Sequence, residues 1–137
     1  AITLALVRAG AKVWVVANNE KAFRDMVKRH DLDDSDKTGN VHWVQADLRV
    51  PSEAIAGAKK AVEGAGGTMD LLVNNAGVCI LEDFMDVSPE TFDKSIAINT
   101  RAPLLVSQVC LEGMIKQRYG KIVNITSQSA VIATKAH

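Results

Sequence analysis

The stretch "LLVNNAGV", residues 71–78, decides how the rest of the chain is interpreted. It begins as an apolar strand and ends in two adjacent amides, Asn74 and Asn75, which are followed by Ala76 and Gly77. Buried strands avoid Asn because its amide needs hydrogen-bond partners. The amides are therefore expected where the strand leaves the sheet, either beside a ligand crevice or in a plain Asn-rich turn.

Apolar strands and amphipathic helices alternate along the rest of the 137 residues. Hydrophobic spacing and turn residues predict strands over 13–17, 41–46, 69–75 and 121–127, and helices over 2–9, over 20–30, from Pro51 and from Ser88 towards Tyr119. Such alternation predicts a parallel sheet covered by helices. The fold class expected is therefore α/β, with a parallel sheet, and residues 1–137 are expected to form one domain.

Two expectations concern burial. The run "VWVVA", 13–17, is continuous and β-branched, which is typical of a strand buried on both faces of a parallel sheet. In the helix that begins at Pro51, the spacing of Ile55, Ala58 and Val62 predicts that these residues form the inner face.

Composition excludes several classes of function. Lys and Arg together number 16, as do Asp and Glu, so no broad basic field attracts nucleic acid or an anionic membrane. No apolar stretch approaches membrane length. Cys79 and Cys110 have no metal-ligand spacing and no secretory context, so we expect reduced thiols, no metal site and a cytoplasmic protein.

Polar residues follow each expected strand: Asn18 after the first, Asp47 after the second, Asn74 and Asn75 after the third, and Ser127 after the fourth. In open parallel sheets, ligands bind beyond the carboxyl ends of the strands. The pattern therefore predicts a ligand crevice at this edge. For Asp47 a turn residue facing solvent is the competing interpretation, and for Ser127 an ordinary helix cap.

A proline inside the last long helix marks another candidate. Pro103 has no N–H, so the carbonyl of Asn99, four residues earlier, loses its helical donor and the axis is expected to kink. That carbonyl is then free to bind something else. A packing kink with nothing bound is the alternative.

Three motifs, in order and at matching spacing, resemble the short-chain dehydrogenase/reductase family. They are "NNAG" at 74–77, "INTRAP" at 98–103 and "GKIVNITS" at 120–127. The resemblance covers the whole chain as the middle portion of a family member, and is greatest to the L-xylulose (dicarbonyl) and carbonyl reductase branch. It implies an α/β fold with a Rossmann-like doubly wound parallel sheet, of which residues 1–137 would form a partial NAD(P)-binding domain. It implies an NAD(P)-dependent oxidoreductase that transfers a hydride between a nicotinamide and a small carbonyl or secondary-alcohol substrate.

The resemblance also implies catalytic roles. Ser127 matches the family serine that hydrogen-bonds the substrate carbonyl, with Ser129 as the second choice. Asn99 matches the residue whose main chain holds a water in a proton relay. Asn74 should tie adjoining strands together.

The cofactor residues follow in the same way. Asn75, Ala76 and Gly77 should border the nicotinamide ribose. Asp47, with Leu48 beside it, should lie near the adenine ring. Asn18 stands where related NADP enzymes often have Arg, and Ala17 where NAD enzymes have an acid. The missing carboxylate favours NADP as the cofactor, with NAD still possible.

Both ends of the family pattern are missing from this sequence. The glycine-rich loop should precede Ala1, and no Tyr-x-x-x-Lys follows Ser127. We therefore expect a fragment without the first strand and the C-terminal third of the fold, with two half-sheets facing a gap, poorly folded and inactive alone. The rival interpretation is a truncated relative that binds nucleotides or partners without catalysis. In this family the helix over 89–119 forms subunit contacts, which implies a homo-oligomer, a dimer or tetramer.

Overall fold

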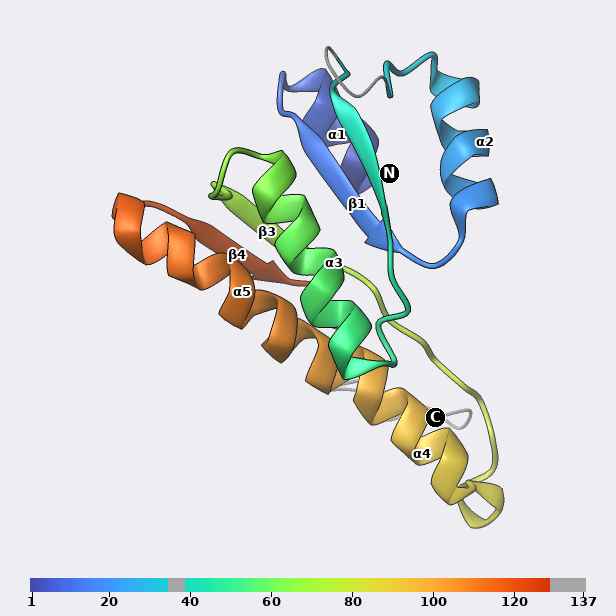
Figure 1. The fold of residues 1–137 in the computed structure, drawn as a ribbon. Coiled ribbons are helices and arrows are strands. Elements are labelled where there is room, and N and C mark those ends of the chain that lie inside the picture. The colour runs from blue at the N-terminus through green and yellow to red at the C-terminus, as the bar shows by residue number, and fades with distance from the viewer. Residues whose placement is uncertain (35–38, 129–137) are drawn as a thin grey trace.

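The computed structural model describes residues 1–34 and 39–128, and helices alternate with strands along them (Figure 1). The elements are α1 (Ile2–Arg8), β1 (Val13–Ala17), α2 (Glu20–His30), β2 (Val41–Gln45), α3 (Pro51–Gly64), β3 (Leu71–Asn74), the 3-10 turn η1 (Phe84–Asp86), α4 (Pro89–Ile96), the π-helical segment η2 (Ala97–Arg101), α5 (Ala102–Gln117) and β4 (Lys121–Asn124). The α/β alternation expected from the sequence is confirmed.

Local signals in the sequence explain where several helices begin and end. The side chain of Asn19 accepts a hydrogen bond from the backbone N–H of Ala22 at 2.9 Å and caps α2. Ser88 caps α4 in the same way, through the N–H of Thr91 at 3.1 Å. Gly10 adopts a φ of 87°, a conformation that suits glycine beyond the end of α1.

The strands form two separate parallel pairs (Figure 1). β1 pairs with β2, with Val13 opposite Val41, and β3 pairs with β4, with Leu71 opposite Lys121. No ladder of hydrogen bonds joins the two pairs within the described residues. The structure therefore contains two half-sheets, as the expected topology implied.

The main hydrophobic cluster lies where α1 and α2 cover the first sheet. It is built on Val7, Phe23, Val27 and Val41, and Trp43 packs against the ring of Phe23 with centroids 5.1 Å apart. β1 itself is half-buried along its whole length. This differs from the burial on both faces that the sequence predicts, because β1 belongs to a two-stranded sheet and has a strand neighbour on one side only.

Small residues bring α3 close to its neighbours. Its buried positions are Ala54, Gly57, Ala58 and Ala61. The prediction of the inner face was therefore right for Ala58 and wrong for Ile55 and Val62, which are only half-buried. Since α3 contacts β1, β2 and α5, it links the two halves of the molecule.

The long helix expected after Ser88 is divided into α4, η2 and α5, which lie end to end in Figure 1. The π-helical segment comes just before Pro103, and the N–H of Ala102 reaches back to the carbonyl of Ala97. A π turn is one way in which a helix accommodates a residue that cannot donate a hydrogen bond. Among residues 1–34 and 39–128, no helix has the length and apolar character needed to cross a membrane.

Candidate functional site at the carboxyl ends of the strands

Asn74, the last residue of β3, lies at a junction of three elements. Its Nδ2 donates to Oδ1 of Asn124, on β4, at 2.8 Å and to Oγ of Ser107, on α5, at 3.1 Å. Its backbone carbonyl accepts from the N–H of Ile125 at 2.9 Å. The expectation that Asn74 ties adjoining strands together is confirmed. An Asn is tolerated at the end of this apolar strand because its side-chain amide has hydrogen-bond partners on β4 and α5.

Asn99 holds the turn that follows β3. Its Oδ1 accepts from the backbone N–H of Val78, and its Nδ2 donates to the carbonyl of Val78, both at 2.9 Å. The side-chain amide thus pairs with both backbone polar groups of one residue, as a strand partner would. The turn containing Asn75, Ala76 and Gly77 is therefore held against the segment η2.

Gly77 has space around it. A Cβ added there would meet Oδ1 of Asn99 at 3.5 Å and the carbonyl of Asn75 at 3.9 Å, which are ordinary contacts. The packing of the chain itself does not require glycine here, and Asn75, Ala76 and Gly77 are all exposed. The turn can therefore accept a group that approaches its backbone closely, as a nicotinamide nucleotide would.

Asp47, in the loop after β2, is already paired. Its Oδ1 accepts from the backbone N–H of Arg49 at 2.9 Å and from Nε at 3.0 Å, and its Oδ2 accepts from Nε at 2.9 Å. These hydrogen bonds from Arg49 lower the pKa of Asp47. An adenine amino group that approached this carboxylate would have to share it with the guanidinium.

Leu48 lies where the two halves meet. It lines a small cavity of about 20 Å³ together with residues from the end of β3, the turn after it, η2 and α5. These residues are Asn74, Ala76, Ile98, Ala102, Pro103 and Val106. Leu48, which the resemblance places near the adenine ring, and Ala76, which it places near the nicotinamide ribose, therefore line one cavity.

Asn18 is exposed and follows β1 directly, while its neighbour Asn19 is occupied in capping α2. The N–H of Ala46 donates to the carbonyl of Ala17 at 3.0 Å, which keeps the ends of β1 and β2 side by side. No carboxylate follows β1 within 17–19.

Ser127 is exposed and lies beyond the carboxyl end of β4, the end at which Asn124 meets Asn74. Tyr119 precedes the same strand and lies at its amino end, opposite to the end where Ser127 lies. Ser129, the second choice, lies outside the described residues. The structure thus brings Asn74, the 75–77 turn and Asn99 together, with Ser127 at the same edge of the sheet.

Four residues of this region were not predicted from the sequence: Arg49, Arg101, Ser107 and Asn124. A signal existed for Asn124, because "LLVN" and "KIVN" are apolar strands that both end in Asn and pair in register. The bond between Arg101 and the backbone of Arg49 and the bond between Asn74 and Ser107 depend on the approach of distant segments, and no local pattern indicates them. The pair of Arg49 with Asp47 is local, since the two residues are two positions apart.

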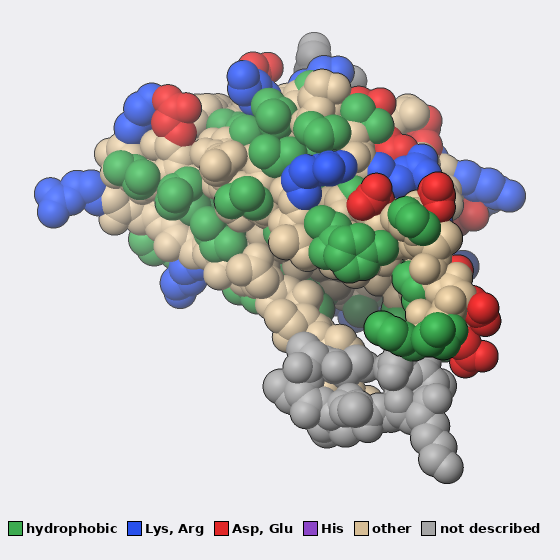
Figure 2. Space-filling model, turned by 90° about the horizontal axis from the view of Figure 1, so that it is seen from below, with side chains coloured by type: hydrophobic (Ala, Val, Ile, Leu, Met, Phe, Trp, Pro, Cys, Tyr) green, Lys and Arg blue, Asp and Glu red, His purple; other side chains and the backbone are tan. Residues whose placement is uncertain are grey.

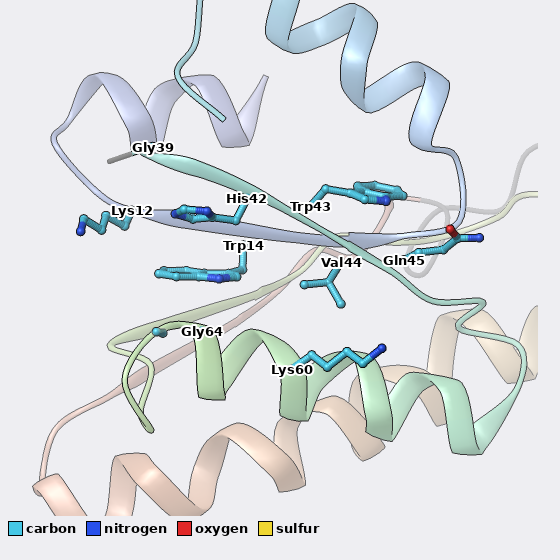
Figure 3. A pocket seen from close by; sticks show the side chains of 10 residues that line it. Lys12, Trp14, Gly39, His42, Trp43, Val44, Gln45, Lys60 and Gly64 are labelled. Atoms are coloured by element: carbon cyan, nitrogen blue, oxygen red, sulfur yellow. The ribbon is translucent and has the colours of Figure 1, made fainter. Parts of the chain in front are cut away.

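A separate depression lies along β2, beside α3 (Figure 3). It measures about 550 Å³ and is lined by Lys12, Trp14, His42 and Lys60 among others. Figure 3 shows the ring of Trp14 stacked on that of His42, with centroids 4.6 Å apart. Its lining includes none of the residues of the predicted site.

Both cysteines are free thiols. Cys79 is exposed, whereas Cys110 is buried in α5, and burial raises the pKa of the Cys110 thiol. Within the described part of the chain, no group of three or more His, Cys, Asp or Glu residues could hold a metal ion.

Comparison with known proteins gives a consistent result. The family model of the short chain dehydrogenases matches residues 1–136. L-xylulose reductase of Mesocricetus auratus is 37% identical over 135 residues, which are 98% of this chain and 50% of that protein. The NADP(+) L-rhamnose 1-dehydrogenase of Thermoplasma acidophilum is 33% identical over 132 residues, which are 95% of this chain and 50% of that protein.

A comparison with solved structures gives the same result as the sequence comparisons. The apo SCOR enzyme from Clostridium thermocellum superposes with a TM-score of 0.81 at 27% identity, covering 97% of this chain and 51% of that one. The chain therefore spans about half the length of the relatives it matches. With its paired parallel strands, the amide junction at Asn74 and a match over nearly its whole length, the chain belongs to the short chain dehydrogenase family.

Proposed function

We propose that the protein takes part in NAD(P)-dependent oxidation and reduction of small carbonyl and secondary-alcohol compounds, with sugars as the substrate class. The observation that carries this proposal is the double hydrogen bond between the amide of Asn99 and the backbone of Val78. It holds the exposed turn of Asn75, Ala76 and Gly77 at the carboxyl edge, where parallel sheets bind nucleotides. The sugar substrates named for the relatives support the substrate class.

In this proposal the bound nicotinamide nucleotide supplies or accepts the hydride. Asn75, Ala76 and Gly77 bind its ribose, and Leu48 and Asn18 lie along its adenine half. Ser127 donates a hydrogen bond to the substrate carbonyl and increases its polarisation. The main-chain carbonyl of Asn99 holds a water for proton transfer. Asp47 acts through its pair with Arg49 rather than as a free carboxylate.

We propose NADP(H) as the preferred nucleotide. A carboxylate after the equivalent of β1 would repel a 2′-phosphate, and residues 17–19 carry none. The relative from Thermoplasma acidophilum that is named as an NADP(+) enzyme supports this choice. A cytoplasmic location stays a prediction.

We also propose self-association through the long helix. Apolar side chains along α4, η2 and α5 are exposed: Phe92 by 58%, Ile96 by 42%, Leu104 by 58%, Leu111 by 42% and Ile115 by 66%. The view from below looks onto this side of the molecule, and apolar side chains spread across it (Figure 2). An exposed apolar surface of this kind is typical of a protein interface, which favours a dimer or tetramer.

The test compares the purified wild-type protein with purified variants. NADPH and NADH are titrated by their fluorescence, and then turnover with small ketoses is measured. We expect tighter binding of NADPH, and in Ser127→Ala a kcat lowered about a hundredfold with nucleotide affinity kept. Ser129→Ala is the matched control.

Two results would contradict the proposal in different ways. Absence of binding for both nucleotides would remove the cofactor assignment. Binding without turnover on any carbonyl or alcohol substrate would favour the rival, a nucleotide-binding relative without catalysis. For self-association, Leu104→Glu should dissociate the oligomer in sedimentation, and an unchanged sedimentation coefficient would exclude this interface.

A further inference from the structure

The predicted cofactor residues lie on two separately bonded parts of the molecule. Asn18, Asp47 and Leu48 follow strands of the first sheet, and Asn75 to Gly77 follow β3 of the second. No strand ladder joins these sheets within residues 1–34 and 39–128. A dinucleotide that extends from one part to the other needs their loops at a fixed separation, and contacts other than sheet hydrogen bonds must provide it.

A hydrogen bond from Arg101 makes one such contact. Its Nη2 donates to the backbone carbonyl of Arg49 at 2.9 Å, across 52 positions of sequence. Arg49 belongs to the loop between β2 and α3, where its side chain also holds Asp47, and Val50 closes the turn with an N–H bond of 3.0 Å to the carbonyl of Asp47. One guanidinium on the long helix therefore holds the backbone of the adenine-side loop.

Arg101 lies in the same short segment as Asn99, and this position makes its contact with the 47–50 loop important. It is the last residue of η2, the same π-helical turn that carries Asn99. Asn99 holds the turn after β3, and Arg101 holds the loop after β2. Both loops are thus attached to one short, internally bonded segment. Leu48, Ile98 and Ala102 line the small cavity at the same junction.

We propose that Arg101 is a positioning residue: it fixes the 47–50 loop relative to η2, and so sets the distance between the adenine and nicotinamide halves of the cofactor site. The part of the inference that concerns the cofactor rests on the proposed function. The part that concerns the position of the 47–50 loop can be measured without the cofactor. Both Arg101 and Arg49 are exposed, so the bond acts locally and contributes little to global stability.

The experiment compares Arg101→Met and Arg101→Lys with the wild type, with Lys94→Met as the matched control on the exposed surface of α4. Amide hydrogen exchange of Val50 reports the loop, and NADPH titration reports the site. For Arg101→Met we expect exchange at Val50 to be roughly tenfold faster, a roughly tenfold higher Kd for NADPH and an unchanged melting temperature. Arg101→Lys retains a charged donor and should recover part of both effects.

Three outcomes would overturn the inference. They are unchanged exchange at Val50 in Arg101→Met, an equal change in Lys94→Met, and faster exchange at all amides together, which would indicate a general loss of stability. A wild type that binds no NADPH would instead remove the proposed function, and the exchange at Val50 would still decide whether Arg101 fixes the loop.

Discussion

At the scale of single residues, Asn74 has the most closely defined role. Its amide donates to two oxygens on different elements, so truncation leaves Oδ1 of Asn124 and Oγ of Ser107 without this donor. We expect Asn74→Ala to lower the free energy of unfolding by about 1–3 kcal/mol. Urea denaturation followed by circular dichroism measures this change.

Asn75→Ala is the matched control for Asn74, because Asn75 is the adjacent amide and is exposed. Its effect on stability should stay within about 0.5 kcal/mol. Equal losses in the two variants would contradict the role assigned to Asn74. The comparison also separates an amide that holds the fold from one that is expected to face the cofactor.

A second prediction at the scale of single residues concerns the pKa of Asp47. Its pKa is lowered by the hydrogen bonds from Arg49, so the pair stabilises the folded state above the ordinary Asp pKa of about 3.9, and this contribution is lost as the pH falls through the lower folded value. In Arg49→Met the pKa of Asp47 should rise towards its ordinary value. Carboxyl-carbon NMR titration of Asp47 measures it.

The control for Arg49 is Lys116→Met. It removes the exposed ion pair of Lys116 with Glu112, whose pKa is lowered in the same way. The pKa of Glu112 should rise in that variant, while Asp47 titrates as in the wild type. If Asp47 shifts equally in both variants, the local pairing with Arg49 is not the cause.

At the scale of elements, Gly57 determines how closely α3 approaches the first sheet. A Cβ at this position would lie 2.8 Å from Cβ of Ala46 and 3.0 Å from Cγ1 of Val16. Gly57→Ala should therefore lower the free energy of unfolding by about 1–3 kcal/mol, although alanine favours a helix by about 1 kcal/mol. Thermal and urea unfolding measure the change.

Ala56→Gly, on the exposed side of the same helical turn, provides the reference for helix propensity. It should cost no more than about 1 kcal/mol. A stabilised Gly57→Ala variant would mean that α3 can move away from the sheet without loss, against the close packing described here.

Elements with local signals could be predicted, and those that depend on distant contacts could not. The bounds of α2 agree with the prediction because Asn19 caps its start. The missing donor of Pro103 indicated a disturbance near Asn99, but not the π geometry that absorbs it. The inner face of α3 was misjudged because large apolar residues are expected to be buried, whereas here close packing selects Gly57 and alanines.

In the candidate site, too, residues with a local sequence signal could be predicted, and contacts between distant segments could not. The strand ends indicated Asn74 and the turn after it, because polar residues there break an apolar pattern. The partner of Asn99 is a backbone group of Val78, and the partner of Arg101 is the backbone of Arg49. Backbone groups occur at every position, so no sequence pattern could indicate these contacts.

At the scale of the whole molecule, the two sheets differ in how well they are covered. The first sheet packs on the main cluster, and Val41 is fully buried. In the second, the side chains of β4 are exposed, including Ile122 by 36% and Val123 by 42%. We expect amides of β3 and β4 to exchange with solvent faster than those of β1 and β2, as native-state hydrogen exchange would measure.

Equal exchange rates in all four strands would contradict this prediction. Such a result would mean that the sheets open together, with α3 coupling them into one cooperative unit. Gly57→Ala supplies the control, because loosening α3 should increase the difference between the sheets if that helix is the coupling element.

The π-helical turn also changes the directions in which side chains before and after it point around the helix axis. In an uninterrupted α-helix, Ile96 and Leu104 would point about 80° apart. The extra residue accommodated in a π turn removes about 100° of rotation, so the two side chains differ by only about 20°. The same π-helical turn that carries Asn99 thereby points the exposed side chains of Ile96, at the end of α4, and Leu104, in α5, in nearly the same direction around the helix axis.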